Sequence, residues 1–131
     1  MLNFTLQQER WIDDIQCLIL EPGIFVTRFT NEMHYTMRHV REIERYRASV
    51  SEIPMPHLVI ACPGMTSDKE VRDYGADKKA YQYTSATAIV CNTLAHRILG
   101  NFFIKIQQPP VPTKMFATEE KAMSWLMKFV N

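Results

Sequence analysis

The feature that most constrains this chain is a pair of short apolar runs, each followed by the start of a helix. The runs are His57–Cys62 (HLVIAC) and Ala86–Cys91 (ATAIVC), and neither alternates between apolar and polar residues. Strands of a parallel sheet have this pattern, because helices cover both of its faces. The Pro-Gly pair at 63–64 stops the first run, and Asn92 or Thr93 can cap a helix after the second. The two runs therefore predict an α/β fold with a largely parallel sheet.

An antiparallel hairpin is expected ahead of these strands. Ile15–Leu20 is an apolar run and Ile24–Phe29 is rich in β-branched and aromatic residues. The Pro22-Gly23 pair between them suits a tight turn. A further short strand is expected at 114–116, after a proline-rich loop. The predicted order is β-β-α-β-α-β-α-β-α, a mixed sheet of four or five strands with about four helices packed on it.

The helices follow from three- and four-residue apolar spacing and from capping residues. Thr36 can cap the first helix, Ser67 and Glu70 have the spacing of a capping box for the second, and Thr118 can cap the last. The third helix has a clear apolar face, which we expect to pack on the sheet: Ala95, Ile98, Leu99, Phe102, Phe103 and Ile106.

Length and charge limit the function classes. The 131 residues suit a single domain over 1–131, in which the polar segment 1–10 packs loosely. Fifteen basic and fourteen acidic residues give a net charge of +1, which argues against nucleic-acid binding and against a polybasic membrane anchor. The sequence has no run of about 20 apolar residues, so we expect no membrane insertion, and no secretory leader is evident. Three widely spaced cysteines indicate reduced thiols, so we expect a cytoplasmic protein.

The last third of the chain carries a family resemblance. Leu94–Leu126 contains a GNFF helix, a P-x-P loop, a K-x-F strand and an EEKA-x-x-WL helix, and 22–24 and Leu58–Met65 also fit. This combination resembles a family of small bacterial STAS/SEC14-like (SpoIIAA-like) domain proteins of unknown function, over roughly Ile15 to Val130. The resemblance implies a STAS-like (SpoIIAA-like) single-domain α/β fold.

The same resemblance suggests a regulatory site. In the anti-sigma-factor antagonists that this family resembles, a Ser or Thr after a central strand is phosphorylated by a partner kinase. The matching place here is the loop with Gly64, Thr66 and Ser67, although the antagonists carry an Asp-x-Ser-Gly motif that this loop lacks. Asn92 and Thr93 follow the neighbouring strand, so the two loops could form the rim of a small anion site. The alternative is a turn and two helix caps.

No set of residues predicts catalysis. Cys62 precedes a helix, as the nucleophile of a Cys-x5-Arg phosphatase does, but Asp68 stands where the arginine would be. The four histidines show no metal-ligand spacing, and we read them as surface or strand-end residues; the four glycines form no nucleotide-binding motif. We therefore expect no catalytic residues, no metal and no cofactor.

Two surfaces could bind a partner. An apolar pocket or dimer face could include Phe102, Phe103, Met123, Trp125 and Met127, although methionine and aromatic residues more often pack in cores. Four arginines of the first helix could face an acidic partner or simply be a solvated face: Arg38, Arg41, Arg45 and Arg47.

The sequence thus predicts a non-enzymatic regulatory or protein-interaction module. We expect a homodimer that also binds a regulatory protein partner, with phosphorylation at Thr66 or Ser67 as a means of control. An alternative is a carrier of a small, lipid-like ligand. A less favoured alternative is an enzyme with an unrecognised site, such as a thiol at Cys62.

Overall fold

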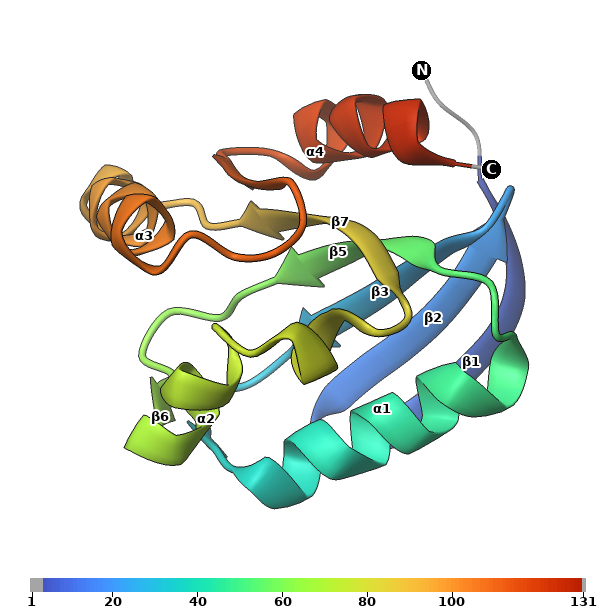
Figure 1. The fold of residues 1–131 in the computed structure, drawn as a ribbon, viewed down its shortest axis with the longest axis horizontal. Helices are drawn as coiled ribbons and strands as arrows, with labels where there is room; N and C mark the ends of the chain where they lie inside the picture. Colours follow the sequence, from blue (N-terminus) through green and yellow to red (C-terminus); the bar gives the residue numbers. More distant parts are fainter. Residues whose placement is uncertain (1–3, 131) are drawn as a thin grey trace.

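The computed structural model describes residues 4–130 and has a six-stranded mixed sheet with helices on both faces (Figure 1). The order across the sheet is β1-β2-β3-β5-β7-β8, with β1, β2 and β3 antiparallel and β3, β5, β7 and β8 parallel. The strands of this sheet are β1 (Thr5–Ile12), β2 (Ile15–Glu21), β3 (Ile24–Phe29), β5 (Met55–Ile60), β7 (Thr84–Val90) and β8 (Thr113–Phe116). The helices are α1 (Met37–Val50), α2 (Lys69–Tyr74), α3 (Leu94–Gln107) and α4 (Glu119–Leu126), with short 3₁₀ turns η1 (Lys78–Tyr81) and η2 (Met127–Phe129).

The α/β fold predicted from the sequence is confirmed, and the main sheet has one strand more than the four or five expected. That strand is β1, in the segment predicted to pack loosely, and residues 1–3 lie outside the described part of the chain. The side chains of Thr5–Trp11 are exposed, so β1 is held mainly by backbone pairing with β2. An edge strand of this kind has no buried face and therefore no apolar alternation by which to recognise it.

Two apolar cores lie on opposite faces of the sheet. On one face, α1 contributes Ile43 and Tyr46 to a core with residues of β2 and β3. On the other, α4 contributes Ala122 and Leu126, which are fully buried over β3, β5 and β7. The alanines of β7, Ala86 and Ala88, are fully buried there. The sheet is thus covered on both sides at its centre, as the two apolar runs predicted.

A second, minimal sheet lies beyond the carboxyl end of β5. Here β4 (His34–Tyr35) pairs in parallel with β6 (Thr66–Ser67), so that His34 lies opposite Thr66. This pairing fixes the loop that follows β5 against the segment leading into α1. In Figure 1, β6 and α2 lie at the same end of the molecule as α3.

Candidate functional site

The loop after β5 begins with a glycine that its conformation requires. Gly64 has φ +84°, a left-handed conformation that other residues rarely adopt. It also lies against Glu32: a Cβ at Gly64 would come within 3.0 Å of Glu32 Oε1. A carboxylate at this distance opposes binding of an anion by the backbone amides of the loop. The expected anion site at Gly64 therefore has an unfavourable electrostatic neighbour.

Thr66 belongs to a hydrogen-bonded chain that the sequence did not suggest. His34 Nδ1 lies 2.7 Å from Thr66 Oγ1, and His34 Nε2 lies 2.6 Å from Asp68 Oδ1. A carboxylate only accepts, so Nε2 carries a proton, and in the neutral imidazole Nδ1 accepts from the Thr66 hydroxyl. Thr66 is an exposed residue, and His34 and Asp68 are about half exposed, at 52% and 48% of their side chains, so the chain lies at the surface. The carboxylate orients the imidazole, and the imidazole in turn holds the Thr66 hydroxyl, so the chain of hydrogen bonds links β4 to β6.

Ser67 does not cap α2, contrary to the predicted capping box with Glu70. The N-cap residue is Asp68, because the chain is still extended in β6 at Ser67. The Ser67 hydroxyl instead accepts from Arg72 Nη1 at 3.2 Å, and the same nitrogen donates to the Ser67 carbonyl at 2.6 Å. Since α2 has only six residues, it offers no strong N-terminal dipole.

Thr93 serves as a helix cap, one of the two roles left open for it. Its Oγ1 accepts from the backbone N–H of His96 at 3.3 Å, at the start of α3. Of five cavities between residues 4 and 130, none is lined by any of the predicted loop residues: Gly64, Thr66, Ser67, Asn92 and Thr93. The shared rim that we expect from these two loops therefore stays a prediction.

The apolar face of α3 points away from the sheet, contrary to expectation. The residues turned toward the protein are Arg97, Gly100 and Ile104, which recur at three and four positions. Arg97 donates to the carbonyl of Cys91 at 2.8 Å, and Gly100 lies closely against Met115 of β8. The opposite side of the helix carries six large apolar side chains, each 46% to 65% exposed: Leu94, Ile98, Leu99, Phe102, Phe103 and Ile106.

The residues predicted to form one apolar pocket or face are divided between two helices. Phe103 lines a cavity of about 290 Å³ between α3 and α2, while Phe102 faces outward. Met123 is buried and lines a different cavity of about 310 Å³ beside α4. Trp125 packs on two aromatic rings at the end of the chain, and Met127 is 36% exposed. These residues therefore do not make a single site.

Two predictions about charged and polar side chains are wrong because the residues are buried. Arg47 is 4% exposed and donates to three backbone carbonyls, so it is not part of a surface patch. His39 is 5% exposed: its Nδ1 accepts from the backbone N–H of Thr36 at 3.0 Å, and its Nε2 lies 2.9 Å from Asp13. These contacts join the start of α1 to the β1–β2 turn.

The class of fold is shown by a solved structure. An uncharacterised protein from the DUF3478 family, from Shewanella loihica PV-4, has a SpoIIAA-like fold and is similar to this chain with a TM-score of 0.57. The similarity covers 95% of this chain and 92% of the other, at 15% sequence identity. The chain therefore has a SpoIIAA-like fold, as the resemblance in the sequence implied.

The particular family is the one described as a domain of unknown function, DUF7793. Its model matches residues 18–130, and the chain belongs to it. No curated protein matches the chain. None of the helices between residues 4 and 130 has both the length and the apolar character needed to cross a membrane.

Proposed function

We propose that this protein is a non-enzymatic interaction module that associates with a second copy of itself through α3. The observation that carries this proposal is the outward apolar face of α3. Large apolar side chains in contact with water cost free energy, and covering them stabilises an assembly. The SpoIIAA-like fold and the regulatory role that its resemblance implies are consistent with an interaction module.

The exposed area fits a pair of identical helices. With about 200 Å² for a large apolar side chain, the exposed fractions on α3 amount to roughly 600–700 Å² per copy. A stable interface buries about 800 Å² per partner, so α3 supplies most of what a dimer needs. Two copies related by a two-fold axis present the same patch to each other, so a single contact covers the apolar face of both helices. The 14-residue helix contains no acidic residue, so no carboxylate has to be buried in this contact.

Sedimentation equilibrium tests the interface. Wild type is expected to dimerise at micromolar concentration, and Phe102→Asp is expected to be monomeric because it would place a charge in the apolar contact. Ile53→Asp is the matched control, since Ile53 is also apolar and 61% exposed but lies far along the chain from α3. A wild-type protein that stays monomeric, or a dimer that Phe102→Asp leaves intact, would contradict the proposal.

We further propose that the loop at Thr66 and Ser67 regulates this association. Arg72 connects the two places: it bonds Ser67 and also lines the cavity beside Gly100 and Phe103 of α3. A phosphate on Ser67 would add about 1.5–2 negative charges next to this guanidinium. It would draw Arg72 toward the phosphate and so change the lining of the cavity beside α3.

The phosphomimetic Ser67→Asp is therefore expected to change the dimer dissociation constant by about fivefold, the size of a typical coupling between sites. Adding Arg72→Gln should remove most of that change. If Ser67→Asp leaves the dimer dissociation constant unaltered, the regulatory part of the proposal is wrong, while the α3 interface is judged by its own test.

A second candidate function is supported by the cavity beside α4. It has about 310 Å³, the lower end of the range for ligand pockets, and its walls are mainly apolar: Phe4, Leu18, Leu20, Val26, Leu58 and Met123. At its polar edge Arg28 donates two hydrogen bonds to Glu119, and Glu120 also lines it, so the occupant expected here is apolar and carries no negative charge. Native mass spectrometry of the freshly purified protein tests for a small carrier, for which a retained lipid mass is expected and a clean apo mass would count against it.

A further inference from the structure

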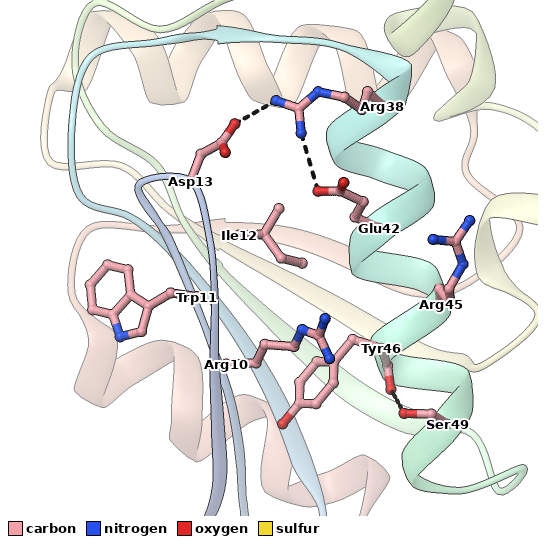
Figure 2. Close-up of a pocket in the computed structure, with 9 residues that line it drawn as sticks. All are labelled: Arg10, Trp11, Ile12, Asp13, Arg38, Glu42, Arg45, Tyr46 and Ser49. Atoms are coloured by element: carbon pink, nitrogen blue, oxygen red, sulfur yellow. Dashed lines mark hydrogen bonds and ion pairs between the residues drawn. The ribbon is translucent and has the colours of Figure 1, made fainter.

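A groove between β1 and α1 is lined by charged residues and is separate from the proposed α3 interface. It has about 480 Å³ and lies beside the β1–β2 turn. Figure 2 shows Ile12 beneath it, with Arg10 and Asp13 from the β1 side and Arg38 and Glu42 from the helix. The remaining lining residues are Trp11, Arg45, Tyr46 and Ser49. In the view of Figure 2 the Trp11 ring points away from α1, so it contributes to the outer edge only.

The two carboxylates of the groove are committed to one arginine. Arg38 lies 2.5 Å from Asp13 Oδ2 and 3.2 Å from Glu42 Oε2. Among residues 4–130, neither Arg10 nor Arg45 makes an ion pair. Three arginines and two acids line the groove, so it carries one net positive charge from its lining residues.

Arg10 lies in the groove next to an aromatic ring. Its guanidinium carbon is 5.8 Å from the centre of the Tyr46 ring, within the range of a weak cation–π contact. Glu9, the neighbouring acid on β1, instead accepts from Gln16 of β2 at 2.6 Å. Among residues 4–130 this guanidinium makes no ion pair, so its N–H groups can donate to phosphate or carboxylate oxygens, whose geometry they match.

We propose that this groove binds the oxyanion end of a small ligand, a phosphate or a carboxylate, through Arg10 and Arg45. Arg10 supplies hydrogen-bond donors beside Tyr46, and Arg45, one turn before Ser49 on α1, supplies the second positive charge. Arg38 remains the structural residue that joins the turn to α1.

Titration with inorganic pyrophosphate or citrate at constant ionic strength, followed by ¹H–¹⁵N NMR, tests this proposal. Saturable shifts are expected at Arg10, Arg45 and Ser49. Arg10→Gln and Arg45→Gln should each weaken binding about tenfold, as expected for loss of one charged hydrogen-bonding group. The control is Arg41→Gln, which makes the same charge change on α1 outside the groove lining.

Two results would overturn the site. One is the absence of saturable shifts at millimolar pyrophosphate and citrate together with no binding to phosphatidylserine vesicles. The other is equal weakening by Arg41→Gln and Arg45→Gln, which would show general charge attraction only. Vesicle binding that needs Arg10 and Arg45, without binding of the soluble anions, would support the site and assign its phosphate to a lipid headgroup.

Discussion

At the scale of single residues, two basic side chains away from the surface, His57 and Arg47, are expected to affect the stability of the fold most. His57 of β5 lies partly buried against Phe25, with ring centroids 4.9 Å apart, and its Nε2 is 2.9 Å from Thr27 Oγ1. Burial, and then the nearby charge of Arg47, lower the pKa of His57 to about 4. The histidine is therefore neutral in the folded protein where an unfolded chain would begin to protonate it.

This lowered pKa predicts acid sensitivity. The unfolded chain takes up a proton at His57 near pH 6.5, whereas the folded protein does not. The free energy of unfolding is therefore highest above about pH 6.5 and falls as the pH drops toward 4. The loss is roughly 2–3 kcal/mol at the lower limit. The free energy of unfolding in urea, measured at about pH 7 and at about pH 5, should differ less between the two pH values for His57→Gln than for wild type. His96→Gln is the control at an exposed histidine, and equal differences in all three proteins would refute this role for His57.

Arg47 is expected to stabilise the fold through its hydrogen bonds. Its guanidinium donates to the carbonyls of Ser51, Ile53 and Tyr83 at 2.6–3.1 Å, which joins the end of α1 to the start of β7. Arg47→Met leaves these acceptors without the donor, so the free energy of unfolding should fall by about 3 kcal/mol. Arg41→Met, on the exposed side of α1, should change it by no more than about 0.5 kcal/mol. Equal effects would show that the hydrogen bonds of Arg47 contribute little.

At the scale of elements, α3 is oriented opposite to an ordinary amphipathic surface helix. Ile104 lies on the side turned toward β8, and Ile106, two residues later, is 61% exposed on the other side. Ile104→Lys should therefore destabilise the monomer by about 1 kcal/mol or more, and Ile106→Lys by no more than about 0.5 kcal/mol. Urea unfolding at a concentration too low for association makes the comparison. A larger loss for Ile106→Lys would mean that the helix packs with its apolar face inward.

Elements with strong local patterns could be predicted from the sequence. The β2–β3 hairpin, the first helix after Thr36, the two buried strands and the helix after Thr118 form where the apolar spacing and the caps place them. The position of α3 is also as predicted, and of the two candidate caps, Asn92 and Thr93, the structure uses Thr93. Periodicity identifies the apolar side of a helix but not which side meets the rest of the protein, so the outward orientation could not be predicted.

The candidate site was harder to predict because its groups come from distant segments. His34 and Thr66 are 32 residues apart and meet only through β4 and β6, which have two residues each. Strands so short leave no pattern in a sequence. Arg10 and Tyr46 are likewise brought together only by the packing of α1 across the antiparallel end of the sheet.

At the scale of the whole molecule, the cover of the sheet is uneven. The two buried cores depend on α1 and α4, whereas α3 contributes no buried residue within the described chain. In Figure 1, α3 lies at the side of the molecule, beyond β7 and away from α1. The fold therefore does not depend on the apolar face of α3, which remains available to cover a second molecule.

Hydrogen exchange measured over a range of protein concentrations tests this central claim most directly. Amides of α3 should exchange more slowly as the concentration rises, because pairing of two copies suppresses opening of the helix, while the exchange of α1 stays constant. Phe102→Asp should remove this dependence, and Ile53→Asp should preserve it. The account would be contradicted if the exchange of α3 were independent of concentration, or if protection developed on another surface instead.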